Sequence, residues 1–391
     1  MRTIRFGLIG AGLMGREFAS AAARWCHLLD LDFCPEIVAV CDTQPAALDW
    51  FRRHVPTVEL VTGDYRELAA CDKVEAVYCA IPHHLHAEVY TAIIEAGKHL
   101  LGEKPFGIDR EANDRILKAL ARRPDLLVRC SSEFPFFPGA QRVIAAIREE
   151  RFGRIIEVEA GFWHSSDLNP YKPINWKRRR ETNGEYGCMG DLGMHVVHIP
   201  FRFGWVPATV YAQLSSIVAE RPDGRGGTAP CDTWDNAVLS CVVENDGESF
   251  PMTLSTKRIA PGHTNTWFIR IIGTEFSIEY STADPKSLWS MAYKPGEAQA
   301  WRREWLGHET AYPTITGSIF EFGFSDAILQ MWAAFCDELV NGERMAQGFR
   351  CATPEETAAS HALFTAALRS HARRSVEVVE WPRRPDRGEG A

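Results

Sequence analysis

The sequence predicts an α/β protein with a doubly wound parallel sheet in its N-terminal part and an α+β domain with a large, mainly antiparallel, open sheet in its C-terminal part. Two observations support this prediction. Short, nearly continuous apolar runs alternate with helical patterns in the first third of the chain, as parallel strands buried on both faces require. The later runs are longer and alternate between apolar and polar residues, as in a sheet with one covered face. We expect domains at residues 1–130 and 131–391.

The first domain is expected to alternate strands with helices. The predicted strands are Thr3–Ile9, Glu36–Cys41, Ala76–Ile81, His99–Leu101 and Leu126–Cys130. The predicted helices are Leu13–Leu29, Pro45–Arg53, Leu85–Glu95 and Arg110–Ala121. Alternation of this kind implies right-handed βαβ units.

The second domain is expected to open with a helix at Gln141–Glu150 and to continue with sheet strands. The predicted strands are Ile155–Phe162, Thr209–Ser216, Ala237–Val243, Met252–Lys257, Trp267–Ile272 and Phe276–Tyr280. Helices at Asp326–Val340 and Pro354–His371 are expected to close this domain, because Thr353, Pro354 and the acids after them form a helix-start pattern. The segment Arg221–Gly227 is predicted to be a loop, and the tail Arg383–Ala391 to be frayed.

Composition excludes several classes of protein. The 391 residues carry 43 basic and 51 acidic side chains, a net charge of −8, which disfavours general binding to nucleic acid or to an anionic membrane. No apolar run is long enough for a membrane span, and the glycine-punctured start does not fit a signal peptide. The 11 cysteines are scattered without a CxxC pair, so we expect reduced core residues in a cytoplasmic protein.

A dinucleotide-binding motif lies between the first strand and the first helix. Gly10-Ala11-Gly12-Leu13-Met14-Gly15 matches G-x-G-x-x-G in the required context. Gly10 allows a tight turn, Gly12 lets the backbone approach a pyrophosphate, and Gly15 permits close helix–strand packing. We expect this stretch, with Leu13 and Met14, to bind the cofactor at the helix N-terminus. The alternative is a glycine-rich turn that binds no ligand.

Asp42 ends the second predicted strand and is the candidate for cofactor selection. Its carboxylate can accept hydrogen bonds from both ribose hydroxyls of an adenosine and would repel a 2′-phosphate. NAD is therefore favoured, with NADP as the alternative. Asp42 could instead be the N-cap of the following helix.

Two later segments add a more specific signal. Ile81-Pro82-His83-His84-Leu85-His86 follows one strand, and Glu103-Lys104-Pro105 follows the next. Together with the glycine motif, they resemble the glucose–fructose oxidoreductase / inositol dehydrogenase (Gfo/Idh/MocA) family of NAD(P)-dependent oxidoreductases. Its members have Thr-Pro-Asn-x-x-His and then Glu-Lys-Pro. Here Ile81 replaces the Thr and His83 the Asn, whereas Pro82 and His86 match.

The resemblance continues through Glu185–His195 and Gly273–Ser277. It implies a Rossmann domain that binds NAD with Pro82, His83, His86 and Glu103, the last near the nicotinamide ribose. It also implies that Lys104 is an active-site residue. A lysine ammonium there could hold the reacting hydroxyl and stabilise charge on its oxygen. The alternative for Lys104 is an ordinary exposed lysine.

Asp191 and His195 are four residues apart and would share one face of a helix over Gly190–Ile199. His195 could take the hydroxyl proton, while Asp191 binds a neighbouring hydroxyl or orients the imidazole. The resemblance implies that both are catalytic residues and, with Lys104, also bind substrate. Without it, a helix-start aspartate beside a structural histidine would explain the spacing.

Contacts near Ser131–Pro138 do not transfer from the family, because members often have an Asn-x-Arg element there. Asp167–Pro170 followed by Asn175-Trp176-Lys177 resembles a loop of sugar-oxidising members, which often have Trp-Arg where Trp176-Lys177 stands. We take Trp163, Trp176 and Lys177 as candidates for the substrate pocket wall, where aromatic faces suit sugar stacking. The run Lys177–Arg180 could bind an anionic substrate, but a solvated loop is the simpler explanation. No metal site is predicted, because no carboxylate or cysteine completes a ligand set with His83, His84 and His86.

We therefore expect an NAD(P)-dependent oxidoreductase that moves a hydride between nicotinamide and a secondary hydroxyl of a sugar, polyol or glycoside. The small-molecule substrate would bind between the two domains, and the protein would be a homodimer or homotetramer without nucleic-acid or membrane partners. The alternatives are a lyase or glycosidase that uses NAD without net redox change, a non-catalytic nucleotide-binding regulator, and a reductase of a ring or imine. Net NADH formation distinguishes the dehydrogenase from the first two.

Overall fold

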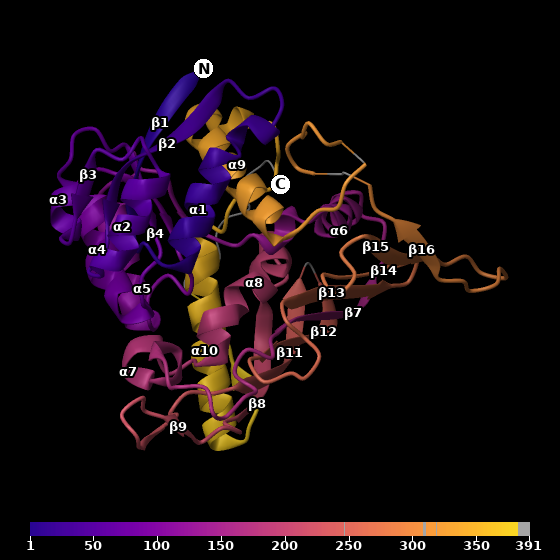
Figure 1. Ribbon diagram of the computed structural model, residues 1–391. Coiled ribbons are helices and arrows are strands. Elements are labelled where there is room, and N and C mark those ends of the chain that lie inside the picture. The colour runs from indigo at the N-terminus through magenta and orange to yellow at the C-terminus, as the bar shows by residue number, and fades with distance from the viewer. Residues whose placement is uncertain (246, 308–309, 318, 382–391) are drawn as a thin grey trace. The chain divides into compact units, whose positions relative to one another are not determined.

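The computed structural model describes residues 1–245, 247–307, 310–317 and 319–381. The chain forms two compact units: unit 1 contains Met1–Phe136 and Thr310–Pro354, and unit 2 contains Phe137–Glu309 and Glu355–Ala391. Figure 1 labels the elements of both units. The tail Arg383–Ala391, expected to be frayed, lies outside the described residues.

Unit 1 is built on a six-stranded, wholly parallel sheet with the order β3-β2-β1-β4-β5-β6. Its strands are β1 (Arg2–Ile9), β2 (Phe33–Cys41), β3 (Leu60–Thr62), β4 (Ala76–Cys79), β5 (His99–Gly102) and β6 (Val128–Cys130). The order reverses between β1 and β4, and open α/β sheets bind ligands at the carboxyl ends of the strands beside such a point. The predicted doubly wound Rossmann sheet is confirmed.

The helices of unit 1 cover both faces of this sheet. They are α1 (Leu13–Ala23), η1 (Trp25–His27), α2 (Pro45–His54), α3 (Tyr65–Ala69), η2 (His83–Leu85), α4 (His86–Glu95), α5 (Arg110–Ala121), η3 (Phe134–Phe136), α9 (Phe324–Asn341) and η5 (Gly342–Arg344). The predicted helix Leu13–Leu29 was too long, because the α-helix ends at Ala23 and one turn of 3-10 helix follows. The short elements β3 and α3 were not predicted.

Helix α9 packs within unit 1, although it follows the strands of unit 2 in the sequence. It contacts α1 and β2, and its Trp332 is fully buried against Phe6, with ring centroids 5.2 Å apart. Phe18 of α1 stacks on Tyr78 of β4 in the same core, with centroids 4.1 Å apart. Its place in the sequence predicts a helix of the second domain, but its apolar face completes the core of unit 1.

Unit 2 is built on a nine-stranded sheet with the order β16-β15-β14-β13-β7-β12-β11-β8-β17. The strands are β7 (Ile155–Trp163), β8 (Pro207–Ser215), β11 (Asn236–Asn245), β12 (Glu248–Lys257), β13 (Thr266–Gly273), β14 (Phe276–Ser281), β15 (Ser287–Ala292), β16 (Arg302–Trp305) and β17 (Glu377–Val378). All neighbours are antiparallel except β7 and β12. The predicted mainly antiparallel sheet is confirmed, whereas β15, β16 and β17 were not predicted.

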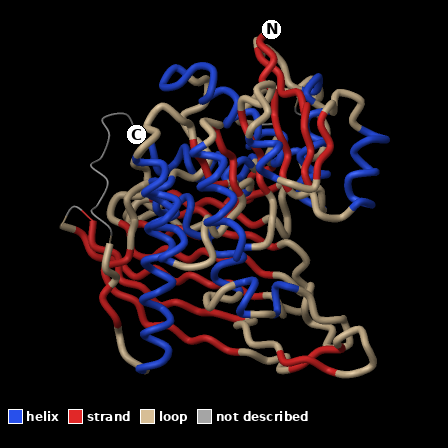
Figure 2. Tube along the Cα trace, turned by 90° about the vertical axis from the view of Figure 1, so that its left-hand side faces the viewer, coloured by secondary structure: helices blue, strands red, loops and turns tan. Residues whose placement is uncertain are grey.

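One face of this sheet is covered by helices, which Figure 2 shows in blue against the red strands. The remaining elements of unit 2 are α6 (Pro138–Arg148), η4 (Trp176–Arg178), α7 (Arg180–Asn183), α8 (Cys188–Arg202), β9 (Glu220–Pro222), β10 (Thr228–Pro230) and α10 (Pro354–Arg373), the last beginning at the end of unit 1. The predicted loop Arg221–Gly227 is largely the turn of the β9–β10 hairpin.

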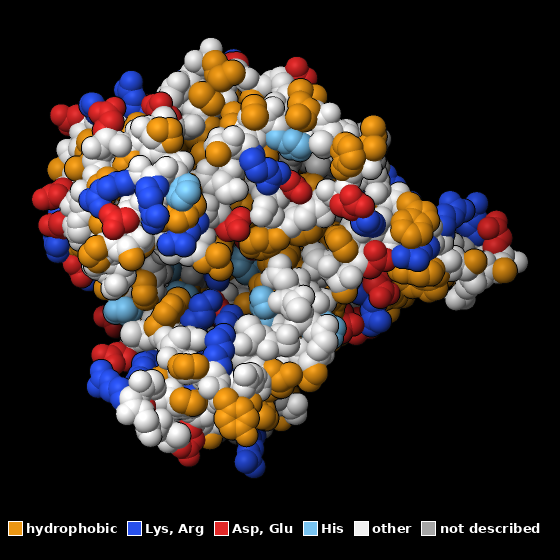
Figure 3. Space-filling view, viewed as in Figure 1, with side chains coloured by type: hydrophobic (Ala, Val, Ile, Leu, Met, Phe, Trp, Pro, Cys, Tyr) orange, Lys and Arg blue, Asp and Glu red, His pale blue; other side chains and the backbone are white. Residues whose placement is uncertain are grey.

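Charged side chains of both signs are interspersed on the face shown in Figure 3. In the described part of the chain, no helix combines the length and apolarity that crossing a bilayer requires.

Candidate functional site

The glycine-rich turn joins β1 to α1 at the carboxyl edge of the parallel sheet. Gly10 has a φ of +97°, and a Cβ there would lie 2.2 Å from the carbonyl oxygen of Ala80. A Cβ on Gly15 would lie 2.2 Å from the carbonyl oxygen of Gly10, whereas a Cβ on Gly12 would meet nothing within 4 Å. Gly10 and Gly15 are therefore required by the fold, and Gly12 borders open space.

The N-terminus of α1 suits an anionic ligand. Gly12 is its N-cap, and among the described residues no side chain caps it and no acid lies in its first turn. Leu13 is 76 % exposed and Met14 is half-buried. Uncapped N–H groups and the helix dipole favour a negative group here, and a neighbouring residue without a Cβ lets it approach. The turn therefore fits the pyrophosphate of a dinucleotide.

Asp42 connects this turn to the second strand. Its Oδ2 accepts a hydrogen bond of 2.7 Å from the Ala11 N–H, and its Oδ1 accepts one of 2.8 Å from the Gln44 N–H. The N-cap of α2 is Gln44 rather than Asp42. Asp42 thus holds the glycine-rich turn against the end of β2 while remaining partly exposed.

The histidines after β4 occupy different environments. His83 is buried in η2, beside the partly exposed Pro82. His86 is fully buried, lies 3.0 Å from the Ile81 carbonyl oxygen through Nε2, and accepts a 3.4 Å hydrogen bond from the Gly107 N–H at Nδ1. These partners place the proton on Nε2. His86 therefore joins the end of β4 to the segment after Lys104.

Glu103 directly follows β5 and is held by hydroxyl groups. Its Oε1 accepts hydrogen bonds from Tyr78 at 2.7 Å and from Ser131 at 2.6 Å, and its carbonyl oxygen accepts one from Tyr90 at 2.9 Å. Two donors on one buried carboxylate oxygen keep this side chain in a single position. The partly exposed Lys104 comes next, and the Lys104–Pro105 peptide bond is cis.

Glu133 is a buried titratable group for which no sequence motif predicts a role. Burial and the negative charge of Glu103 raise its pKa to about 7, and the positive charge of Lys104 partly opposes this. Its neighbours Tyr78 and Ser131 both donate to Glu103. The only sequence signal was its position just after β6, at the same carboxyl edge as Lys104.

Helix α8 carries two of the three predicted catalytic residues. It begins after Gly187, whose φ is +56° and whose Cβ would lie 2.5 Å from the Trp234 amide nitrogen. Its residues from Cys188 to Phe201 are all buried, because the helix packs on strands β7 and β12. Asp191 and His195 are thus fixed by a buried element.

Asp191 is fully buried and paired through both carboxylate oxygens. The ammonium nitrogen of Lys177 lies 2.9 Å from Oδ1, and the guanidinium of Arg258 contacts Oδ2. Two cations around one buried carboxylate favour its ionised form. Asp191 is therefore suited to electrostatic and orienting work rather than to taking a proton.

His195 packs edge-on against Phe162 of β7, with ring centroids 5.5 Å apart. Its backbone carbonyl accepts a 2.8 Å hydrogen bond from the Trp267 indole. These contacts hold His195 on the covered face of the sheet. His198, one turn further on, lies 3.1 Å from the Arg202 guanidinium and 3.8 Å from Glu356, a separate buried cluster.

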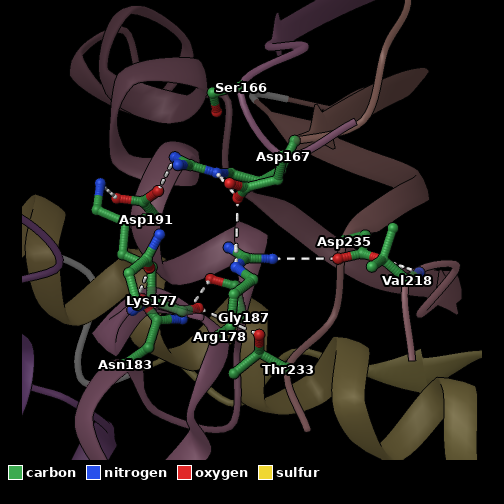
Figure 4. Close-up of polar contacts among 12 residues, drawn as sticks. Ser166, Asp167, Lys177, Arg178, Asn183, Gly187, Asp191, Val218, Thr233 and Asp235 are labelled. Atoms are coloured by element: carbon green, nitrogen blue, oxygen red, sulfur yellow. Dashed lines mark hydrogen bonds and ion pairs between the residues drawn. The ribbon is translucent and has the colours of Figure 1, made fainter. Parts of the chain in front are cut away.

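The pairing of Asp191 extends into a chain of buried ion pairs, drawn in Figure 4. Arg258 also lies 3.1 Å from Asp167, and Arg178 bridges Asp167 at 3.3 Å and Asp235 at 3.1 Å. Burial alone would raise the pKa of Asp167, but the charges of Arg258 and Arg178 hold it below its usual value. The prediction of a solvated loop over Lys177–Arg180 therefore does not hold for the whole run, because Arg178 is fully buried.

The three residues predicted to line the substrate pocket, Trp163, Trp176 and Lys177, do not all lie together. Lys177 reaches Asp191, and its ammonium lies 5.5 Å from the centroid of the partly exposed Trp176 ring. Trp163 packs edge-on against Phe268, with centroids 4.9 Å apart. Because side chains alternate along β7, Trp163 faces away from the side on which Phe162 meets His195. The structure therefore does not bring Trp163 to Asp191 and His195.

The predicted residues form two groups. Unit 1 holds the glycine-rich turn, Asp42, Glu103 and Lys104 at one sheet edge, and unit 2 holds Lys177, Asp191 and His195 around α8. Among the described residues, no group of three or more His, Cys, Asp and Glu side chains is arranged to hold a metal ion.

Family models match both parts of the chain. A model described as the oxidoreductase family with an NAD-binding Rossmann fold matches residues 4–129, and one for the GFO/IDH/MocA C-terminal domain matches residues 140–279.

Individual proteins with related sequences are enzymes. Levoglucosan dehydrogenase of Pseudarthrobacter phenanthrenivorans is 26% identical over 296 residues, which cover 72% of this chain and 74% of that protein. Alpha-N-acetylgalactosaminidase of Shewanella oneidensis is 27% identical over 49% of this chain and 43% of its own length. The chain spans about half the length of several other curated relatives.

Solved structures share the fold. Levoglucosan dehydrogenase in complex with NADH and L-sorbose has a TM-score of 0.85 at 22% identity, covering 98% of this chain and all of that one. An oxidoreductase domain protein from Kribbella flavida has a TM-score of 0.86 at 21% identity, covering 97% of this chain and all of that one. At these identities the likeness shows the fold.

Proposed function

Because the chain belongs to the GFO/IDH/MocA family of NAD-binding oxidoreductases, we propose that it moves a hydride between the cofactor and a secondary hydroxyl of a sugar, polyol or glycoside. The observation that carries this proposal is the carboxyl edge of the parallel sheet, where an open helix N-terminus, Asp42 and the Glu103-Lys104 pair gather. The 26% identity to a levoglucosan dehydrogenase supports the substrate class.

A bound NAD would supply the nicotinamide ring for hydride transfer. We assign its pyrophosphate to the backbone of Gly12, Leu13 and Met14, and its adenosine ribose to Asp42. Glu103, held in place by the hydroxyl groups of Tyr78 and Ser131, lies at the same edge and is assigned to the nicotinamide ribose. Pro82, His83 and His86 shape the backbone beside it.

The protein side chains manage the proton and the charge on the reacting oxygen. Lys104 donates a hydrogen bond to that oxygen and stabilises its negative charge. His195 takes the hydroxyl proton, or returns it in the reverse direction. Asp191, already paired with Lys177 and Arg258, orients the substrate and supports the charge that forms on the imidazole.

Replacing Lys104 or His195 with alanine tests these roles. Each change should lower turnover by about a hundredfold or more, because each removes a group that acts on the reacting hydroxyl. The affinity for NAD, measured by fluorescence titration, should change little. Lys118→Ala and His54→Ala, at exposed positions, are the matched controls. Wild-type turnover in both active-site variants would refute the assignment.

Replacing Asp42 with alanine tests cofactor selection. The loss of a carboxylate that can accept from both ribose hydroxyls should weaken NAD binding more than NADP binding. The Kd values of both cofactors are measured by calorimetry. An unchanged ratio of the two Kd values would contradict a role of Asp42 in cofactor selection. Its hydrogen bond from the Ala11 N–H would then be a structural contact only.

A second candidate function is glycoside cleavage with no net redox change, which the 27% identity to an alpha-N-acetylgalactosaminidase favours. Absorbance assays with a panel of sugars, polyols and chromogenic glycosides separate the two functions. A dehydrogenase accumulates NADH in step with substrate loss, whereas the glycosidase releases the leaving group without net NADH.

We further propose that the enzyme works in the cytoplasm as a homodimer or homotetramer. Buried thiols at Cys41, Cys79, Cys188, Cys241 and Cys336 suit a reducing compartment. The sheet face opposite α8 leaves Trp289 41% exposed, and the edge strand beside it leaves Trp305 71% exposed, which supports a subunit interface.

A further inference from the structure

The turn of residues 104–107 follows β5 and carries the lysine that we assign to the reacting hydroxyl. Within it, Phe106 has a φ of +65°, a left-handed backbone conformation that is strained for a bulky residue. The Phe106 side chain is fully buried and packs on Tyr90, with ring centroids 5.0 Å apart. A residue stays in such a conformation only when the groups around it hold it there, and strain of this kind clusters at functional sites.

Asn113 provides one of the contacts that hold the turn. It lies near the N-terminus of α5, is 1% exposed, and donates a 2.8 Å hydrogen bond from Nδ2 to the carbonyl oxygen of Phe106. Gly107 lies against the same residue, because a Cβ on Gly107, whose φ is +115°, would be 2.7 Å from the Asn113 amide nitrogen. A buried carbonyl that loses its donor is costly, so Asn113 stabilises this conformation of the turn.

Helix α4, which lies beside α5 (Figure 1), holds the backbone on both sides of Lys104. After the lysine, the Gly107 N–H donates a 3.4 Å hydrogen bond to Nδ1 of His86. The His86 ring stacks on Tyr90, with centroids 4.6 Å apart. Before the lysine, the Tyr90 hydroxyl donates a 2.9 Å hydrogen bond to the carbonyl oxygen of Glu103. Groups of α4 and α5, all in unit 1, therefore fix the backbone from which the Lys104 side chain extends.

We propose that Asn113 is a positioning residue for Lys104: it fixes the turn in its left-handed conformation and so directs the lysine ammonium to the reacting hydroxyl. This inference rests on the proposed dehydrogenase function and adds a residue outside the motif that carries Lys104. A group on a fixed backbone loses less entropy when it meets its substrate, and a displacement of about 1 Å can lower a rate by about a hundredfold.

Removing the amide group tests the proposal. In Asn113→Ala, kcat for the best substrate of the sugar and polyol panel should fall by about tenfold to a hundredfold, because the turn is no longer held in one conformation. The Kd for NAD should change little. Ile116→Val, at a buried position of the same helix, lowers stability without removing a polar group and should leave kcat unchanged.

Circular dichroism checks the folding of both variants. A wild-type kcat in folded Asn113→Ala would overturn the proposal. A loss of NAD affinity as large as the loss of kcat would also overturn it, because the residue would then support the cofactor site instead of the lysine.

Asn113→Asp distinguishes positioning from general stability through its pH dependence. A carboxylate cannot donate to the Phe106 carbonyl, whereas a protonated carboxyl group can, and burial favours the protonated form. The kcat of Asn113→Asp relative to wild type should therefore rise as the pH falls, and the same ratio for Asn113→Ala should stay constant. Titratable groups near the turn, at His86, Lys104 and Asp109, are common to all three proteins and cancel in the ratio. A ratio for Asn113→Asp as low as that for Asn113→Ala at every pH would overturn the proposal.

Hydrogen exchange separates this proposal from the proposed function, because it requires no turnover. The Gly107 amide, measured by mass spectrometry on peptides that cover residues 103–108, should exchange at least about tenfold faster in Asn113→Ala than in the wild type or in Ile116→Val. If it does, and no sugar yields NADH with the wild type, Asn113 holds the turn and the proposed function fails. If the wild type forms NADH and Asn113→Ala matches it in exchange and in kcat, the proposal fails and the function stands. Absence of both signals overturns both.

Discussion

At the scale of single residues, unit 1 holds two buried carboxyl groups, those of Glu103 and Glu133, close to the end of the parallel sheet. Glu103 accepts two hydroxyl donors, whereas burial and the charge of Glu103 raise the pKa of Glu133 to about 7. Glu133 is therefore protonated below neutral pH in the folded protein, while its value in the unfolded chain stays near 4.5. The folded state binds more protons between these two values, so stability falls as pH rises through this range.

Glu133→Gln should remove this pH dependence, because glutamine keeps the shape and stays neutral. At pH 8 the variant should have a larger free energy of unfolding than the wild type, by at most about 3 kcal/mol, and near pH 4 the two should agree. Urea unfolding at a series of pH values measures this, with the exposed Glu149→Gln as control. Parallel stability curves for Glu133→Gln and the wild type would contradict the raised pKa.

Arg178 shows why single residues in a charged run cannot be placed from the sequence. The run Lys177–Arg180 is uniformly basic, and a solvated loop was the simpler prediction. Arg178 is nevertheless fully buried, because Asp167 and Asp235, far away along the chain, supply its partners. Arg258 was missed as the partner of Asp191 for the same reason.

At the scale of elements, α8 decides where Asp191 and His195 lie. Its predicted range Gly190–Ile199 falls within the observed range Cys188–Arg202. Helical spacing alone predicted that Asp191 and His195 share one face of this helix. Its packing was not predictable. A Cβ on Gly193 would lie 2.3 Å from the Phe364 ring of α10, so the absence of a side chain sets the distance between the two helices.

Gly193→Ala should therefore destabilise the protein. Overpacking costs roughly 1–3 kcal/mol, which exceeds the gain of about 1 kcal/mol in helix propensity. Denaturant unfolding measures the change, and kcat should fall because α8 carries Asp191 and His195. In a Phe364→Leu background, Gly193→Ala should lower the free energy of unfolding by less than it does in the wild type. An equal loss of unfolding free energy in both backgrounds would show that an alanine side chain at position 193 does not meet the Phe364 ring.

At the scale of the whole molecule, the match to both family models confirms the predicted family, the NAD cofactor and the dehydrogenase class. The Rossmann motifs carried this prediction because each depends on residues that are close together in the sequence: a glycine turn, a strand end and the tripeptide Glu103-Lys104-Pro105. The individual roles of Lys104, Asp191 and His195 stay predictions that the variants above test.

The proposed oligomer makes a prediction of its own. Trp289→Glu combined with Trp305→Lys should lower the molar mass measured by light scattering at micromolar concentration, because charged groups would replace two exposed indole rings of the proposed interface. The double variant Lys294→Met/Glu297→Gln, at an exposed ion pair, should leave the mass unchanged. A monomeric wild type would remove the proposal.

Local patterns in the sequence determined the two kinds of sheet, most of the long helices, the glycine turn and the family, because hydrophobic periodicity and short motifs depend on neighbouring residues. The tertiary structure decided which partners distant residues take. It placed α9 beside α1 and β2, put Arg178 and Arg258 against buried aspartates, and turned Trp163 away from His195. Those outcomes depend on how strands pair and which helix covers which face, since burial and charge pairing form between segments that the chain brings together only on folding.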